Sequence, residues 1–266
     1  MNNLVCFVFI FTLSLNVQAA DWDSSGTVET DGGQLHYRIA GKGIPLLLLH
    51  GYSGYGGQWQ RFLPEFLADN KVIVVDLPGH GQSSKLATSF IVADAARDIW
   101  QLMDHLEVQQ LRGVGYSAGG MTLLQMALLQ PERVKAMILA SSAYRIPKEV
   151  PRGQFEQLPA GYQQDLLRNH NGDKQKIHAM LNAKFQVNMV LSNLKNLRTP
   201  TLLFSGDQDE LFPLQVVVET YTALPNAELW VAPGIGHALF WPWGGSDRLA
   251  REFPGAVLRF FSKHDF

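Results

Sequence analysis

The sequence contains little cysteine and little charge, and each shortage narrows the possible functions. Cys6 is the single cysteine among 266 residues. A chain that loses its first nineteen residues therefore has no thiol, which excludes a disulfide, a cysteine nucleophile and a thiolate metal site. Charged residues make up 17% of the chain, with a formal net charge of −2 and no long run of either sign. This charge distribution does not indicate binding to nucleic acid or to an anionic membrane, both of which need clustered positive charge. It favours a small neutral or apolar partner.

Charge is absent altogether from one stretch near the N-terminus. Residues 4–17 form an uncharged, mainly apolar run, and Val17-Gln18-Ala19-Ala20 follows it. The run is shorter than the roughly 20 residues that a membrane-spanning helix needs. An apolar run before small residues is typical of a secretory signal peptide. We therefore expect residues 1–19 to be cleaved after Ala19, leaving a periplasmic or secreted protein without a stable membrane anchor. The segment MNN carries no Lys or Arg, so a buried N-terminal strand or an uncleaved anchor is the alternative.

The rest of the chain alternates short apolar segments with segments of helical periodicity. Most apolar segments are continuous, as in strands covered on both faces of a sheet. They span residues 27–30, 34–39, 45–49, 71–75, 111–115, 134–140, 201–205 and 227–231. Asp31-Gly32-Gly33 separates the first two and is typical of a hairpin turn. Helical patterns cover residues 58–68, 90–106, 118–130, 214–223 and 247–262. This alternation predicts an α/β fold with a mostly parallel, eight-stranded sheet flanked by helices.

One segment interrupts the alternation. Residues 143–199 show no clear strand, and residues 173–185 carry an amphipathic helical pattern. We interpret residues 143–199 as a small helical lid inserted into a core made of residues 20–142 and 200–266. No repeat, low-complexity tract or linker in the sequence marks a second independent domain.

The pentapeptide Gly115-Tyr116-Ser117-Ala118-Gly119 lies between a predicted strand and a predicted helix. A serine on such a sharp turn has a strained backbone and an exposed hydroxyl near the N-terminus of the helix. Glycine two residues to either side lets strand and helix approach closely. The pentapeptide alone would fit a flexible glycine turn equally well, but its context predicts that Ser117 is a nucleophile.

A serine nucleophile needs a histidine base, and that histidine needs a carboxylate to orient it. His237 lies in a glycine-rich loop after the last predicted strand. Asp207, Asp209 and Glu210 follow the strand predicted at residues 201–205. We expect Asp209 to be the acid, Asp207 to be a turn residue and Glu210 to be solvated. The predicted triad of Ser117, Asp209 and His237 needs no metal or cofactor.

Five segments, in this order, resemble the α/β-hydrolase superfamily over nearly all of the chain after the leader. They are Leu49-His50-Gly51-Tyr52, DLPGHGQS at residues 76–83, GYSAGG at 115–120, GDQDELFP at 206–213 and GIGH at 234–237. The resemblance implies that the backbone N–H groups of Tyr52 and Ala118 form an oxyanion hole. It also implies that His50 positions the Gly51–Tyr52 backbone, and that Asp76, His80 and Gly81 shape a neighbouring loop without doing chemistry.

Within the superfamily, serine carboxylesterases are the broadest fit. The segment from His237 to Trp243 is similar to that of pimeloyl-carrier-protein methyl ester esterases. The expected function is hydrolysis of a small or medium apolar carboxylic ester. Lactone opening, carbon–carbon bond hydrolysis and perhydrolysis use the same triad and stay open, as does ligand binding without catalysis.

Several aromatic residues are candidates to line the substrate pocket. They are Tyr55, Tyr144, Phe240, Trp241 and Trp243. The alternative for the last three is simple packing of the final loop, because aromatic clusters mostly serve cores.

The expected leader can be tested directly. Expression of the full chain in a host with a periplasm should give a periplasmic protein whose N-terminal residue is Ala20. Intact-mass measurement checks this, and Ala19→Arg should retain the leader because the cleavage site requires a small residue. A wild-type protein that keeps residues 1–19 would contradict the assignment.

Overall fold

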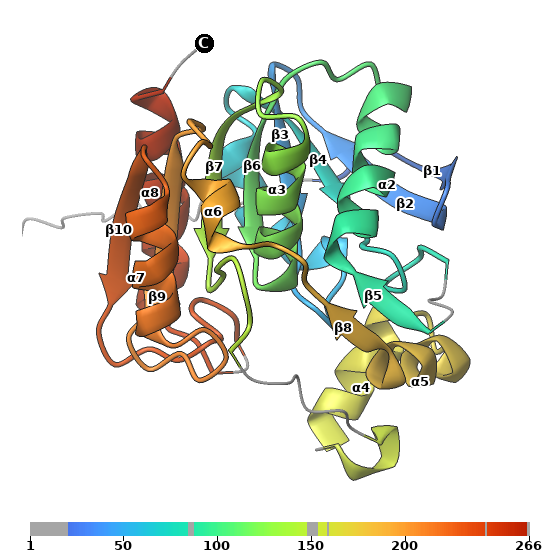
Figure 1. Ribbon diagram of the computed structural model, residues 1–266. Helices are drawn as coiled ribbons and strands as arrows, with labels where there is room; N and C mark the ends of the chain where they lie inside the picture. The colour runs from blue at the N-terminus through green and yellow to red at the C-terminus, as the bar shows by residue number, and fades with distance from the viewer. Residues whose placement is uncertain (1–20, 85–87, 148–153, 159, 243, 265–266) are drawn as a thin grey trace, which may run out of the picture.

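The protein is described by a computed structural model that covers residues 21–84, 88–147, 154–158, 160–242 and 244–264. The expected leader and Trp243 lie outside the described residues. At the centre is an eight-stranded sheet with the order β1-β2-β4-β3-β6-β7-β9-β10 (Figure 1). The strands are β1 (Ser24–Thr30), β2 (Gly33–Ala40), β3 (Ile44–Leu49), β4 (Asn70–Val75), β6 (Leu111–Tyr116), β7 (Val134–Ala140), β9 (Thr201–Gly206) and β10 (Ala227–Ala232).

The direction of the strands confirms the predicted sheet. β1 and β2 form the predicted hairpin, and β2 is also antiparallel to β4. The remaining neighbours are parallel. All eight strands fall at the apolar segments predicted from the sequence, with ends that differ by a few residues.

Helices cover both faces of the sheet, which explains why its strands read as continuous apolar runs. One face carries α2 (Val92–His105), α3 (Ala118–Leu129) and α7 (Leu214–Ala223), and the other carries α8 (Asp247–Ser262). Within β3, Leu47 and Leu49 belong to the first core, whereas Leu46 and Leu48 belong to the second. No helix within the described ranges is both long enough and apolar enough to span a membrane.

Two predicted helices differ from the observed structure. Residues 58–68 form a 3₁₀ helix, η1 (Gly56–Phe62), followed by the short α1 (Leu63–Phe66). Residues 90–106 begin with a short strand, β5 (Ser89–Ile91), before α2. Apolar periodicity by itself does not distinguish an α-helix from shorter elements with similar spacing.

The insertion between β7 and β9 contains η2 (Phe155–Gln157), α4 (Ala160–Asn169), α5 (Lys174–Asn182), β8 (Lys184–Gln186) and α6 (Leu191–Leu194). The expectation that it contains no strand was wrong, because β8 pairs in parallel with β5. Phe185 of β8 stacks on Phe90 of β5, with ring centroids 5.2 Å apart. Both strands have three residues, too few for a recognisable sequence pattern.

Phe240 and Trp241 lie in the core on the α8 face, and each is only 1% exposed. The Phe240 ring packs against Phe253 with centroids 4.2 Å apart, and Trp241 packs edge-on against Trp59 at 5.4 Å. The expectation that these two residues line a substrate pocket is therefore corrected, because neither ring has a surface to offer a ligand. Their position next to His237 in the sequence does not fix the face to which they point.

This core assignment predicts a large effect on stability. Phe240→Ala should lower the free energy of unfolding by about 3–5 kcal/mol, because it leaves a cavity in a packed aromatic cluster. Urea unfolding checks this, with Tyr221→Ala as the control because Tyr221 is 38% exposed. An unchanged stability accompanied by weaker substrate binding would contradict the core assignment.

Candidate active site

Ser117 occupies a sharp turn between β6 and α3. Its φ of 53° and ψ of −119° lie in a region that non-glycine residues rarely adopt. Its backbone N–H donates to the carbonyl oxygen of Ala140 at 2.9 Å. A Cβ on Gly119 would lie 2.4 Å from the Leu49 oxygen, and one on Gly115 would lie 2.5 Å from the Gly119 oxygen. Only glycine at these two positions lets the helix sit this close to the strands, which is what the pentapeptide predicted.

His237, on the loop between β10 and α8, reaches the serine. Its Nε2 lies 3.1 Å from Ser117 Oγ. The Tyr116 hydroxyl donates to the His237 carbonyl oxygen at 2.9 Å, and the Phe212 ring stacks on the imidazole with centroids 5.7 Å apart. Ser117 is 8% exposed and the His237 side chain 15%, so both side chains lie at the edge of the interior.

Asp209, on the loop after β9, contacts the other nitrogen of the imidazole. His237 Nδ1 lies 3.0 Å from Asp209 Oδ2 and 3.1 Å from Oδ1. The backbone N–H groups of Leu211 and Phe212 donate to Oδ1 at 2.9 and 2.8 Å, which fixes the orientation of the buried carboxylate. With Nδ1 donating its proton to this carboxylate, Nε2 is left as an acceptor for the serine hydroxyl.

The neighbouring acids behave as the sequence suggested. Asp207 Oδ1 accepts a hydrogen bond from the Gly234 N–H at 2.6 Å and so joins the acid loop to the histidine loop. Glu210 is exposed to solvent. The structure thus brings Ser117, His237 and Asp209 together from three loops at the ends of β6, β10 and β9.

The two residues expected to form the oxyanion hole lie beside the serine. Ala118 is the first residue of α3, so its N–H has no acceptor within the helix. On the other side, a Cβ on Gly51 would lie 3.2 Å from Ser117 Cβ, so the segment that leads into Tyr52 lies against the turn.

His50 holds this segment. Its Nδ1 donates to the Gly51 carbonyl oxygen at 2.7 Å, and its Nε2 accepts from the Leu77 N–H at 2.9 Å. The bond that Nε2 accepts requires the neutral imidazole, and burial lowers the pKa of His50 to about 4. His50 therefore positions the Gly51–Tyr52 backbone, the role that the family resemblance implies.

Asp76 anchors two loops beside the site. The buried carboxylate accepts from the N–H groups of Gly56 at 2.6 Å and Gln82 at 2.9 Å, and it contacts His36 Nδ1 at 3.0 Å. Burial alone would raise the pKa of Asp76, but the bond to His36 and the charge of Arg38 hold it well below its usual range. The carboxylate is therefore ionised and structural.

Tyr144 and Tyr55, the two remaining candidates for the substrate pocket, differ in their exposure to solvent. The Tyr144 hydroxyl donates to Glu219 Oε2 at 3.2 Å and accepts from Arg145 Nε at 2.7 Å, and the residue is only 9% exposed. Its polar end is therefore occupied by an ion pair. Tyr55 is partly exposed at the start of η1.

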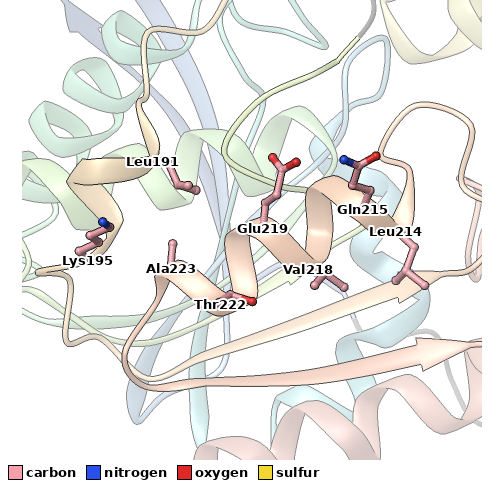
Figure 2. A pocket seen from close by; sticks show the side chains of 8 residues that line it. All are labelled: Leu191, Lys195, Leu214, Gln215, Val218, Glu219, Thr222 and Ala223. Carbon is pink, nitrogen blue, oxygen red and sulfur yellow. The ribbon is translucent and has the colours of Figure 1, made fainter.

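An apolar groove of about 670 Å³ lies between α6 and α7, and Figure 2 shows the side chains that line it. They are Leu191, Lys195, Leu214, Gln215, Val218, Glu219, Thr222 and Ala223. Ser117, Asp209 and His237 are not among them, so the candidate site is located by the contacts of those three residues and not by this groove. Among the described residues, no group of three or more His, Cys, Asp or Glu side chains is arranged to hold a metal ion.

Three contacts at the site were not predicted from the sequence. Tyr116 and Phe212 hold His237, and the Ser142 hydroxyl donates to the Ser117 carbonyl oxygen at 2.9 Å. Tyr116 stands inside the pentapeptide and Phe212 next to Asp209, so their places in the motifs were the available signal. Nothing in the local sequence indicates that Ser142 bonds to a residue 25 positions away.

The chain is similar to several known proteins. A family model described as alpha/beta hydrolase fold matches residues 44–191. The chain is 36% identical over 115 residues to the dihydrolipoyllysine-residue acetyltransferase component of the acetoin cleaving system of Pseudomonas putida. That match covers 42% of this chain and only 31% of the acetyltransferase component.

Two further proteins match over most of their length. The chain is 27% identical over 242 residues to a pimeloyl-[acyl-carrier protein] methyl ester esterase of Yersinia enterocolitica, which covers 78% of this chain and 92% of the esterase. The crystal structure of a hydrolase from Pseudomonas aeruginosa PA01 superposes with a TM-score of 0.74 at 20% identity, covering 90% of this chain and 98% of that one. The second likeness concerns the fold alone.

The buried neutral His50 predicts a dependence of stability on pH. Because its pKa falls from 6.5 to about 4 on folding, the unfolded chain binds a proton between these values that the folded chain does not. The free energy of unfolding should therefore fall as the pH falls from about 6.5 to 4, with a contribution from His50 on the order of 3 kcal/mol.

Urea unfolding at several pH values measures this contribution. His50→Gln keeps an acceptor for the Leu77 N–H but does not titrate, so its stability should depend less on pH over this range. Equal slopes for the wild type and the variant would show that His50 does not stay neutral in the folded protein.

Proposed function

The chain belongs to the α/β-hydrolase fold family, and on that premise we propose that it hydrolyses a carboxylic ester of a small or medium apolar substrate through an acyl-enzyme. The observation that carries the proposal is the 3.1 Å contact between Ser117 Oγ and His237 Nε2, with Asp209 on the opposite side of the same imidazole. A nucleophile, a base and an orienting acid in hydrogen-bond reach of one another form the arrangement that acyl transfer requires.

The proposed reaction has two halves. Ser117 Oγ attacks the ester carbonyl carbon while His237 Nε2 takes the hydroxyl proton, and Asp209 stabilises the imidazolium that forms. The N–H groups of Tyr52 and Ala118 stabilise the negative charge on the carbonyl oxygen. His237 then protonates the leaving alcohol. In the second half, His237 activates a water molecule that releases the acid from Ser117.

The substrate class is argued from similarity and composition. The match to a methyl ester esterase supports an ester substrate, and the low charge of the chain favours an apolar one. The expected leader would separate this protein from a cytosolic pathway, so we also propose a periplasmic or secreted location. The similarity then bears on the shape of the site more than on the natural substrate.

Reaction with a fluorophosphonate tests the nucleophile. The probe should label the wild-type protein on the peptide that contains Ser117, and Ser117→Ala should abolish labelling and lower kcat by at least about 10³-fold. Ser262→Ala is the matched control, because Ser262 is an exposed serine on the last turn of α8. Labelling that survives Ser117→Ala would refute the assignment.

The same preparation separates the alternative reactions. A panel of aryl esters of graded chain length is compared with lactones, and we expect ester turnover to be faster. Faster lactone opening would favour a lactonase on the same triad. Tight ligand binding without turnover of any substrate would favour a binding protein.

A further inference from the structure

Two hydroxyl contacts join the segment beside Ser117 to the inserted lid. The Tyr52 hydroxyl donates to the Met180 carbonyl oxygen of α5 at 2.8 Å. The Ser53 hydroxyl lies 2.5 Å from the Tyr162 hydroxyl of α4. Helices α4 and α5 lie together beyond the ends of the central strands, as the yellow and gold ribbons of Figure 1 show. Tyr52 and Ser53, which lie beside Ser117 in space, are thus held by α5 and α4 of the insertion.

The donor in the contact between Ser53 and Tyr162 follows from the single proton that each hydroxyl carries. The Ser53 hydroxyl has one proton, and it donates this proton to the Tyr52 carbonyl oxygen at 2.6 Å. Ser53 Oγ therefore accepts from the Tyr162 hydroxyl. The resulting relay runs from Tyr162 through Ser53 to the backbone of Tyr52. Ser53 has a φ of 64°, an uncommon conformation for a residue other than glycine, and the relay helps to hold it there.

The Tyr52 ring is enclosed along its length. It packs edge-on against His80 at 4.8 Å, Phe90 at 5.5 Å and Phe185 at 5.4 Å between centroids. Phe185 lies in the insertion and the other two lie in the core. The ring therefore has little freedom to swing, and its hydroxyl meets α5 in a defined place.

The helix that receives this hydroxyl is itself attached to the core. Lys176 of α5 donates through Nζ to the carbonyl oxygens of Gly81 at 3.0 Å and Ser83 at 2.6 Å. Both acceptors lie on the loop that Asp76 anchors through Gln82. Helix α5 is thus a fixed support for Tyr52.

We propose that Tyr162 and the Tyr52 hydroxyl position the oxyanion hole, so that the lid sets the place of the Tyr52 N–H. This inference rests on the proposed function, in which that N–H stabilises the oxyanion. Tyr162 touches no reacting atom in this account and acts through Ser53 as a positioning residue. A movement of α4 or α5 would then shift the Tyr52 N–H relative to the oxyanion.

Tyr162→Phe tests the inference, because it removes the hydroxyl and keeps the ring. We expect kcat to fall about tenfold, a part of the 10²- to 10³-fold that loss of a whole oxyanion donor costs. KM should change less than twofold. Tyr221→Phe, which removes the hydroxyl of an exposed tyrosine on α7, is the matched control and should leave kcat unchanged.

An alkylboronic acid supplies a readout that a general loss of structure would not give. Its tetrahedral adduct with the serine places an oxygen in the oxyanion hole, so its Ki for Tyr162→Phe should rise by the same factor by which kcat/KM falls. Binding of the planar product acid should stay within twofold of the wild type. A loss that appears only in KM, or equally in the binding of both ligands, would overturn the inference.

A double-mutant cycle identifies the relay. Ser53→Ala removes the hydrogen bond from Tyr162 and also the one from Ser53 to the Tyr52 carbonyl oxygen, so it should lower kcat at least as far as Tyr162→Phe does. The double variant should lose no more than Ser53→Ala alone, because the bond from Tyr162 is already absent there. Tyr52→Phe removes the separate contact to Met180, so its factor should multiply with that of Tyr162→Phe. Independent effects of Ser53 and Tyr162 would contradict the relay.

The two proposals can fail separately. If the fluorophosphonate labels the wild type on Ser117 and Tyr162→Phe keeps the wild-type kcat and boronic acid Ki, the positioning role is wrong and the hydrolase assignment stands. If the wild type neither reacts with the probe nor hydrolyses an ester, both are overturned.

Discussion

The close approach of α3 to the ends of β3 and β6 is the constraint on which the rest of the site depends. A side chain on Gly119 would collide with the Leu49 carbonyl oxygen, so the helix reaches this position only with glycine there. The short connection forces Ser117 into its left-handed conformation. The strained turn places Oγ within 3.1 Å of His237 and puts the Ala118 N–H at the first position of the helix, where it has no acceptor within the helix. One packing contact thus determines where the proposed nucleophile and one proposed oxyanion donor lie.

Buried polar groups on the other side of Ser117 fix the segment that carries the second proposed oxyanion donor, the Tyr52 N–H. His50 is neutral because it is fully buried, and it bridges Gly51 to Leu77 through both ring nitrogens. Asp76 is ionised because several donors surround it, and it joins the loops that flank His50. The hydrogen bond from Tyr52 to Met180 then connects this network to the insertion. Ser117, Asp209 and His237 themselves lie outside the insertion, on loops that follow β6, β9 and β10.

The central sheet and the grouping of Ser117, Asp209 and His237 could be predicted from the sequence because both leave local signals. A strand covered on both faces is a continuous apolar run, and the serine, acid and histidine each follow such a strand. The three-residue strands β5 and β8 leave no such pattern, and neither does the burial of Phe240 and Trp241, since local sequence does not fix the face to which a loop residue turns. The hydroxyl contacts of Tyr52 and Ser53 join residues more than 100 positions apart, so only the assembled fold reveals them.

The central claim is that Ser117 carries the acyl group between two half-reactions. Product partitioning tests it most directly: esters that share one acyl group but differ in their alcohol are hydrolysed in the presence of methanol. A common acyl-enzyme predicts the same ratio of methyl ester to free acid for every ester, because the alcohol has left before methanol and water compete. A ratio that changes with the leaving alcohol would show direct attack on the substrate and would contradict the account.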